Sequence, residues 1–194
     1  MGIGSVMQHK AIFLDRDGVL NAAIIKDGKP YPPASINELI IPFGVLDALT
    51  NLKKAGFLLI AATNQPDVAR GKVTRTSVEL INNALMSQLP LDDLRVCFHD
   101  DAEHCACRKP APGLLQAAAL DHHIHLNNSF MIGDRWKDIE AGQRAGCQTI
   151  WLDYQYAEKS PDKAPDYTTT TLMDAANWII KNTTRSSKCN ESRI

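Results

Sequence analysis

Short apolar runs rich in β-forming residues alternate with helical stretches along most of this chain. The runs lie at 11–14, 57–62, 94–98, 129–132 and 149–152. Strands that alternate with helices favour a parallel sheet, because each crossover helix returns the chain to the same edge and covers one face. The sequence therefore predicts an α/β, Rossmann-like three-layer fold with a central, mainly parallel sheet.

The remaining segments complete this predicted organisation. Helices are expected at 45–55, 74–89, 112–120, 136–145 and 173–181, with Gly56 ending the first and Thr74 capping the second. The stretch 153–171, rich in Pro, Asp and Thr, is predicted to be loop. We expect one domain over 1–182, with a catalytic core at about 10–152, and a flexible tail over 183–194.

Composition and charge exclude several classes of protein. The chain has 194 residues, is 44% hydrophobic and 22% charged, and carries a formal net charge of -1. No long block of Lys or Arg indicates a nucleic-acid surface. No signal-peptide core is present, and no apolar run approaches the roughly 20 residues that span a bilayer. We therefore expect a cytoplasmic monomer with neither a nucleic-acid nor a membrane partner.

Residues suited to phosphoryl chemistry stand at or soon after the ends of predicted strands: Asp15, Asp17, Thr63, Asn64, Lys109 and Asp134. Any one Asp taken alone is most often a solvated surface residue. In open parallel sheets, however, the working site lies at the carboxyl ends of the strands, where these residues converge. Their combination at one edge predicts an active site.

Each residue type fits one step of phosphoryl transfer. Asp15 can attack phosphorus and form an aspartyl-phosphate, and Asp17 can act as general acid and then as general base. Attack by one anion on another requires charge neutralisation, which Mg²⁺ near Asp134 can supply. Lys109 and the Thr63 hydroxyl can hold the phosphoryl oxygens.

Four motifs, in this order, resemble those of the haloacid dehalogenase-like hydrolase superfamily: FLDRDGVLN, ATNQ, CRKPAPG and IGDRWKD. The resemblance implies that Asp15 is the nucleophile and Asp17 the acid/base, and that Asp15, Asp17 (through its backbone carbonyl) and Asp134 hold Mg²⁺. Dehalogenase members lack the second Asp, so Asp17 favours phosphoryl transfer. Asp138 is a further metal candidate, through water or the second coordination sphere, or else a first-turn carboxylate that complements the helix dipole.

A cluster of metal-ligand types precedes the lysine: Cys97, His99, Cys105 and Cys107. The motifs C-x-H and C-x-C, five residues apart, predict a zinc site. Four protein ligands leave no open position, so the zinc would be structural and would fix the loop that leads to Arg108 and Lys109. Iron is the alternative metal for such a thiolate-rich site.

Only about 45 residues separate Asp17 from Thr63, and again Thr63 from Lys109, which leaves little room for a separate cap domain. The site is therefore expected to be open. Specificity would then depend on the loops at 21–41 and 64–73 and on the zinc loop.

The zinc loop resembles those of two phosphatase families, which act on heptose bisphosphate, in lipopolysaccharide precursor synthesis, and on histidinol phosphate. The stretch TNQPDVARGKV is more similar to the heptose enzymes, whereas the short gap inside the zinc loop is more similar to the histidinol enzymes. Cations expected near the mouth favour a doubly phosphorylated sugar: Arg70, Lys72, Arg108 and Arg135. The alternative is that Arg70 and Lys72 are solvated loop charges.

The predicted reaction is therefore removal of the 7-phosphate from D-glycero-D-manno-heptose 1,7-bisphosphate. The residues expected to bind this substrate are Asn64, Arg70, Arg108, Lys109 and Arg135. Histidinol-phosphate hydrolysis is the alternative reaction. An inactive, zinc-stabilised binding protein is the alternative from another class, although such a protein would be expected to lack one of the catalytic residues, and all are present.

Overall fold

The computed structural model describes residues 8–191, and the side chains of residues 8–184. Its centre is a six-stranded sheet in the order β5-β4-β1-β6-β7-β8, in which all neighbouring strands are parallel. The strands are β1 (Ala11–Leu14), β4 (Leu58–Asn64), β5 (Asp93–Cys97), β6 (Phe130–Gly133), β7 (Gln148–Leu152) and β8 (Tyr167–Thr169). The predicted α/β fold with a parallel sheet is confirmed.

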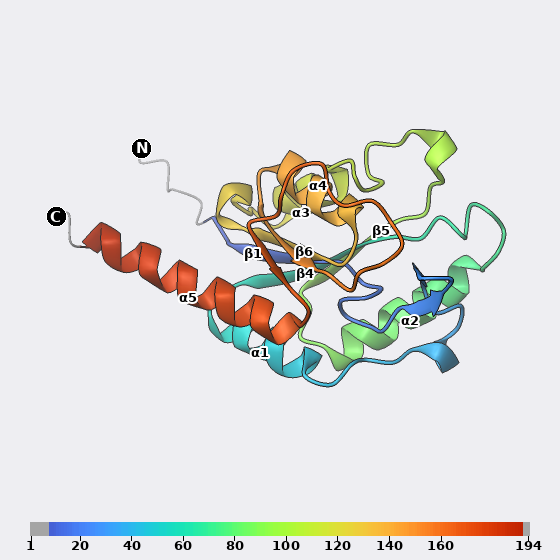
Figure 1. Cartoon of the computed structure of the whole chain (residues 1–194), viewed down its shortest axis with the longest axis horizontal. Helices are drawn as coiled ribbons and strands as arrows, with labels where there is room; N and C mark the ends of the chain where they lie inside the picture. The colour runs from blue at the N-terminus through green and yellow to red at the C-terminus, as the bar shows by residue number, and fades with distance from the viewer. Residues whose placement is uncertain (1–7, 192–194) are drawn as a thin grey trace, which may run out of the picture.

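Helices cover both faces of the sheet, which gives three layers (Figure 1). One face carries α1 (Val45–Lys54), α2 (Arg75–Gln88) and α5 (Leu172–Glu191), and the other carries α3 (Gly113–Asp121) and α4 (Trp136–Ala145). Short 3₁₀ turns lie at η1 (Ile36–Glu38), η2 (Asp101–Glu103) and η3 (Leu126–Asn128). None of the helices in the described part of the chain is long and apolar enough to cross a membrane.

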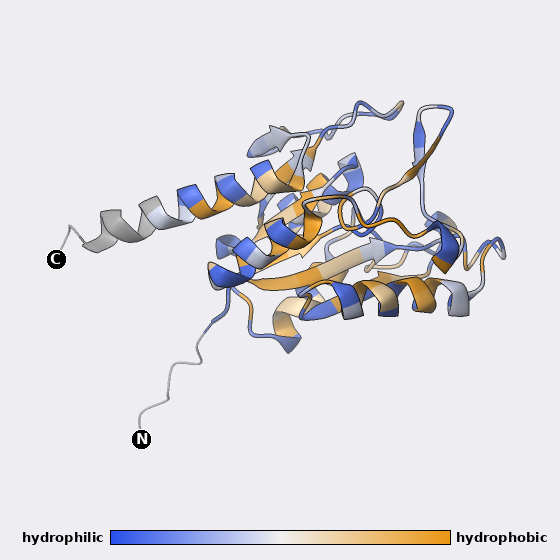
Figure 2. Cartoon of the chain, turned by 90° about the horizontal axis from the view of Figure 1, so that it is seen from below, coloured by the Kyte–Doolittle hydropathy of each residue, from blue (hydrophilic) through white to orange (hydrophobic). Residues whose placement is uncertain are grey.

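The core explains why the strands read as continuous apolar runs. In β1, Ile12 and Leu14 pack towards α1 and α5, whereas Ala11 and Phe13 pack towards α3. Because both faces of the sheet are covered, every residue of this strand is buried. The central strands are accordingly among the most hydrophobic segments of the molecule (Figure 2).

Two predicted boundaries were wrong. The stretch 153–171 is not all loop, because Tyr167–Thr169 forms β8 and pairs in parallel with β7. The last helix does not end at Lys181, because α5 continues to Glu191. Residues 192–194 of the predicted flexible tail lie outside the described residues.

A small hairpin stands beside the sheet in the loop between β1 and α1. Strands β2 (Ile24–Lys26) and β3 (Lys29–Tyr31) pair antiparallel. Asp27 and Gly28, which join them, both have positive φ (51° and 72°), as a type I′ turn requires. The Gly28 carbonyl accepts a 2.8 Å hydrogen bond from the Ala157 amide, which links the hairpin to the segment before β8. No large cap domain is inserted within residues 8–191.

Candidate active site

The predicted catalytic residues meet at the carboxyl edge of the sheet. Asp15 follows β1, Thr63 and Asn64 end β4, and Asp134 follows β6. Lys109 reaches the same point from the loop between β5 and α3. The parallel register of β1 with both β4 and β6 aligns these strand ends, so residues far apart in sequence become neighbours.

Lys109 is buried among oxygen atoms. Its Nζ donates to Asp15 Oδ1 (2.6 Å) and to the carbonyl of Ala62 (2.6 Å), and lies 2.5 Å from Asp138 Oδ1. Burial alone would lower the pKa of Lys109, but the charges of Asp138 and Asp15 raise it above its usual range. The lysine is therefore a fixed positive charge beside the carboxylate of Asp15.

Asn64 holds the lysine from its backbone. The Asn64 side chain donates to the Lys109 carbonyl (2.9 Å) and accepts from the Lys109 amide (3.0 Å). The nitrogen and the oxygen of the Asn64 side-chain amide are thus both hydrogen-bonded to the backbone of Lys109. The reciprocal pair ties the end of β4 to the loop that carries the lysine.

Three buried carboxylates could hold a metal ion. Oxygen atoms of Asp15, Asp134 and Asp138 lie within 4.8 Å of one another. Neither carboxylate oxygen of Asp134 has a hydrogen-bond partner among the described residues, although both are fully buried. Burial, together with the charges of Asp15 and Asp138, raises the pKa of Asp134 well above its usual value. Apart from an interaction with the Tyr156 hydroxyl, which favours the ionised form, this buried carboxylate lacks donors and therefore fits a cation ligand, since desolvation without compensation is costly.

Gly18 makes room for this carboxylate. A Cβ atom at Gly18 would lie 1.9 Å from Asp134 Oδ2, and the φ of Gly18 is +95°. Any larger residue would therefore collide with Asp134 and strain the backbone. The glycine of the FLDRDGVLN motif is explained by this close approach.

The side chain of Asp17 lies in a network of donors that the sequence analysis did not anticipate. Arg16 donates to both Asp17 oxygens (2.9 and 3.0 Å), Asn21 donates to Oδ1 (3.1 Å) and Gln65 donates to Oδ2 (2.7 Å). Gln65 also donates to the Thr63 hydroxyl (2.9 Å). Arg16 and Gln65 belong to the quoted motifs, but only the fold reveals that both side chains turn inward.

Asp138 has two roles in the structure. Its Oδ2 accepts a hydrogen bond from the Arg135 amide (3.1 Å) at the start of α4, as a helix-capping carboxylate does. Its Oδ1 pairs with Lys109. Asp138 thus lies at the helix terminus, as one of the two interpretations requires, and its role as a metal partner stays a prediction.

A cavity of about 220 Å³ opens above Asp15. The inner end of the cavity is lined by Asp15, Asp17, Thr63, Asn64, Gln65, Lys109 and Asp138. Farther out, the walls are formed by residues 29–32, in and after the hairpin, and by four residues of the loop after β4: Pro66, Asp67, Arg70 and Lys72. Beyond Lys109, its basic residues are Lys29, Arg70, Lys72, Arg135 and Lys137, and its further acidic residues are Asp67 and Glu158. The outer part of the cavity therefore favours anions.

The predicted substrate-binding arginines are distributed unevenly. Arg70 and Arg135 line the cavity, but Arg108 is not among its lining residues. Arg135 is ion-paired with Glu158, a cavity residue that the sequence analysis missed. Burial lowers the pKa of Arg135, but the hydrogen bonds that it donates to Glu158, together with the charges of Glu158, Asp138 and Asp134, outweigh burial and raise this pKa.

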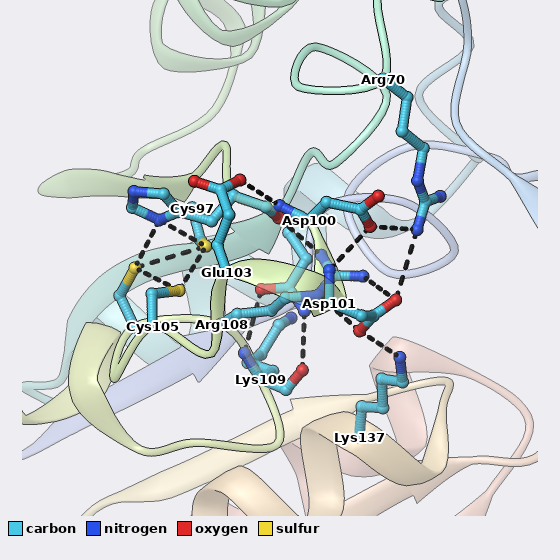
Figure 3. A network of polar contacts seen from close by, with 12 residues as sticks. Arg70, Cys97, Asp100, Asp101, Glu103, Cys105, Arg108, Lys109 and Lys137 are labelled. Carbon is cyan, nitrogen blue, oxygen red and sulfur yellow. Dashed lines mark hydrogen bonds and ion pairs between the residues drawn. The ribbon is translucent and has the colours of Figure 1, made fainter.

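The predicted zinc ligands come together on the loop after β5. The three sulfur atoms of Cys97, Cys105 and Cys107 lie 3.3 to 3.6 Å apart, and His99 Nδ1 lies 3.5 Å from Cys97 and 3.3 Å from Cys107. Tetrahedral zinc with bonds of about 2.3 Å would separate its sulfur ligands by roughly 3.8 Å. The four residues therefore match a closed tetrahedral site with little adjustment (Figure 3).

The fold and the site together define a class of protein. An open parallel sheet that brings a D-x-D pair, a threonine, a lysine and a late aspartate to one edge is the arrangement of haloacid dehalogenase-like hydrolases. The family model described as HAD-hydrolase-like matches residues 106–175, which include Lys109 and Asp134.

Two bacterial relatives show which family within this class the chain belongs to. The D-glycero-beta-D-manno-heptose-1,7-bisphosphate 7-phosphatase of Helicobacter pylori is 36% identical over 159 residues, covering 79% of this chain and 88% of that protein. The enzyme of the same name from Escherichia coli is 34% identical over 185 residues, covering 88% and 94%. The chain belongs to this family of heptose bisphosphate phosphatases among the HAD-like hydrolases.

A solved structure supports the same assignment. The D,D-heptose 1,7-bisphosphate phosphatase from B. bronchiseptica, complexed with magnesium and phosphate, superposes with a TM-score of 0.71 at 27% identity. The alignment covers 89% of this chain and 99% of that one.

Proposed function

We propose that this chain is a Mg²⁺-dependent phosphatase that removes the 7-phosphate of D-glycero-beta-D-manno-heptose 1,7-bisphosphate. The observation that carries the proposal is the combination of a complete phosphoryl-transfer site with a cation-lined outer cavity. The names of its relatives point to the same substrate. A substrate with two phosphate groups uses both parts of this cavity, one at Asp15 and one among the outer cations.

The residues of the inner site would act in two displacements. Asp15 attacks phosphorus, a P–O bond to the carboxylate forms, and the bond to the sugar oxygen breaks. Asp17 gives its proton to the leaving sugar oxygen. In the second step a water molecule attacks the phosphoryl group, Asp17 takes the water proton, and inorganic phosphate and free Asp15 result. Lys109 and Thr63 stabilise the phosphoryl oxygens in both steps.

Asp17 must exchange at least one of its present hydrogen-bond donors for the leaving sugar oxygen in order to act as the acid. As an acid it has to carry a proton on an oxygen that now accepts hydrogen bonds from Arg16, Asn21 or Gln65. The Oδ2 atom, which accepts from Gln65, is on the side of Thr63. We infer that Gln65 steers Asp17 during the reaction and that Asn64 keeps Lys109 in position.

Mg²⁺ fits the carboxylates of Asp15 and Asp134, with Asp138 beside them and the backbone carbonyl of Asp17 as a further ligand. The unpartnered oxygens of Asp134 are the observation that supports this assignment. When bound, the ion supplies positive charge against the phosphoryl oxygens.

Zinc fits the cluster of Cys97, His99, Cys105 and Cys107, where it would be structural. Because its four protein ligands would leave the ion no coordination position for substrate, the ion would not take part in catalysis. It would instead stiffen the loop that ends in Arg108 and Lys109. Thiolate ligands require reduced cysteines, which supports a cytoplasmic location.

Substrate choice is tested by measuring kcat/KM for heptose 1,7-bisphosphate and for histidinol phosphate on one preparation, with Mg²⁺ and with EDTA. We expect a preference of at least about 100-fold for the bisphosphate, since losing the outer charge contacts costs several kcal/mol of transition-state binding. EDTA should abolish both activities. A preference for histidinol phosphate would reject the proposed substrate and leave the phosphatase chemistry intact.

A further inference from the structure

The carboxylate of Asp101 lies where basic side chains from three parts of the chain meet (Figure 3). Arg108 donates to it through Nε (2.8 Å) and Nη2 (3.2 Å). Arg70 Nη2 lies 3.3 Å away, and Lys137 Nζ lies 3.6 Å away. The Asp101 side chain is nonetheless 62% exposed. One solvent-facing carboxylate thus gathers three cations.

Two of these three cations also belong to the substrate cavity. Arg70 and Lys137 line its outer wall, and Arg108 stands directly before Lys109 in the chain. Asp101 itself is not among the lining residues. Asp101 therefore pairs with two cavity cations from outside the cavity lining.

The position of Asp101 is fixed by its own turn. It begins η2, inside the gap between His99 and Cys105. Asp100 Oδ1 accepts a hydrogen bond from the Asp101 amide (2.7 Å), and Glu103 accepts from the Asp100 amide (2.8 Å). Asp100 also accepts from Arg70 at 2.5 Å. The turn is thus ordered by its backbone hydrogen bonds, and the Asp101 side chain is left free to pair with cations.

A phosphate group is a stronger partner for these cations than a carboxylate. It carries up to two negative charges and offers three oxygens to the guanidinium and ammonium groups. The ion pairs of Asp101 with Arg70 (3.3 Å) and Lys137 (3.6 Å) are long and partly exposed and therefore individually weak, so they can be exchanged at small cost. A second phosphate that enters the cavity meets cations already gathered in one place, but has to displace the carboxylate.

We propose that Asp101 is a built-in competitor for the second phosphate group of the substrate, holding the cavity residues Arg70 and Lys137 until that group displaces it. This inference rests on the proposed function and adds to it a residue that determines specificity. A second phosphate displaces the carboxylate, whereas a neutral hydroxyl at that position does not. Asp101 thereby weakens the binding of a substrate whose second phosphate reaches these cations and leaves a substrate with a single phosphate unaffected.

The test compares wild type with Asp101→Asn on two substrates, heptose 1,7-bisphosphate and p-nitrophenyl phosphate. We expect the KM for the bisphosphate to fall roughly two- to fivefold, the factor that corresponds to releasing weak, exposed ion pairs. The KM for p-nitrophenyl phosphate and both kcat values should stay unchanged, because that ester carries a single phosphate. The effect should shrink as ionic strength rises.

Asp121→Asn is the matched control. Asp121 is also an exposed aspartate (59%) paired with an arginine, Arg95, but it lies at the end of α3 and does not line the cavity. This variant should leave both KM values unchanged. Asp101→Ser serves as a second variant of the same residue, since serine can also begin a turn, and metal content is measured for all four proteins.

Each other result would overturn the inference. A higher KM for the bisphosphate in Asp101→Asn would mean that the carboxylate positions the cations for the substrate. Equal KM changes for both substrates would mean that the second phosphate is not involved, and loss of metal in both variants would make Asp101 a structural residue. Failure of the proposed function is distinct, because wild type itself would then not hydrolyse the bisphosphate.

Discussion

At the scale of single residues, the most unusual side chain is Arg16, which is fully buried between the site and helix α2. Its guanidinium donates to Asp17 and, through Nη1, to Asn82 Oδ1 (2.8 Å). A planar group with several donors can hold the acid/base carboxylate and the helix together, which a lysine could not do. We infer that Arg16 positions Asp17.

Arg16→Met should destabilise the protein by about 3 kcal/mol, because it leaves a largely buried carboxylate and a buried amide without their partner. Urea unfolding of the variant and wild type measures the loss. Arg75→Met is the control, since Arg75 forms an exposed ion pair with Glu79 on the same helix and should change stability by less than about 0.5 kcal/mol. Equal losses in the two variants would contradict the role given to Arg16.

The sequence was most informative where chemistry depends on local spacing or on strand ends. The cluster of three cysteines and His99 could be predicted because these residues lie within one loop, and the convergence of Asp15 and Asp134 because parallel strands end at a common edge. Gln65 and Glu158 could not be predicted, since nothing in their neighbours distinguishes a glutamine turned towards Asp17, or a glutamate facing Arg135, from a solvated one. Their roles depend on tertiary contacts.

At the scale of elements, the loop after β5 acts as one unit. It carries the four proposed zinc ligands, and Lys109 follows Cys107 by two residues. The core holds this loop only in part, through contacts of Cys97, Cys105 and Cys107, so a metal bound by these residues would order the rest of it. We therefore expect the position of Lys109 to depend on the bound metal.

Cys107→Ala should lose bound zinc and most of the kcat, because Lys109 would no longer be held against Asp15. Metal analysis and steady-state kinetics on the purified protein measure both. Cys147→Ala is the control, since Cys147 is a buried free thiol outside the cluster and its loss should leave zinc content and kcat unchanged. Full activity in zinc-free Cys107→Ala would reject the coupling.

Elements at the edge of the sheet were the hardest to predict. Strand β8 has three residues, Tyr167 to Thr169, and follows a stretch of Pro and Asp that indicates loop. Its support comes from α5, where Trp178 stacks on Tyr167 with ring centroids 5.0 Å apart. That contact joins two elements, so no local pattern reveals it. The length of α5 was underestimated because its polar second half lacks a clear apolar face.

At the scale of the whole molecule, the buried carboxylates link stability, pH and metal. Burial raises the pKa of Asp15 to about 7, against the lowering effect of Lys109. Without metal, Asp15 therefore keeps its proton up to about pH 7 in the folded protein, whereas in the unfolded chain it loses this proton above its ordinary pKa of 3.8. The stabilisation that this bound proton gives the folded state is fully present below pH 3.8 and is lost as the pH rises through about 7.

Because Mg²⁺ binds the ionised carboxylates, its stabilising effect should grow over the same range. We expect saturating Mg²⁺ to raise Tm more at about pH 8 than at about pH 5.5, relative to EDTA. Differential scanning fluorimetry measures this difference. Asp134→Asn should remove most of it, and an equal Mg²⁺ effect at both pH values would contradict the linkage.

The central claim is that Asp15 carries the phosphoryl group, and it can be tested by rapid quenching with heptose bisphosphate labelled at the 7-phosphate. We predict label on the peptide that contains Asp15 during turnover, and neither label nor measurable turnover in Asp15→Asn, which keeps the shape of the side chain but removes its charge. Turnover in Asp15→Asn at the wild-type rate, with no labelled peptide in either protein, would contradict the account.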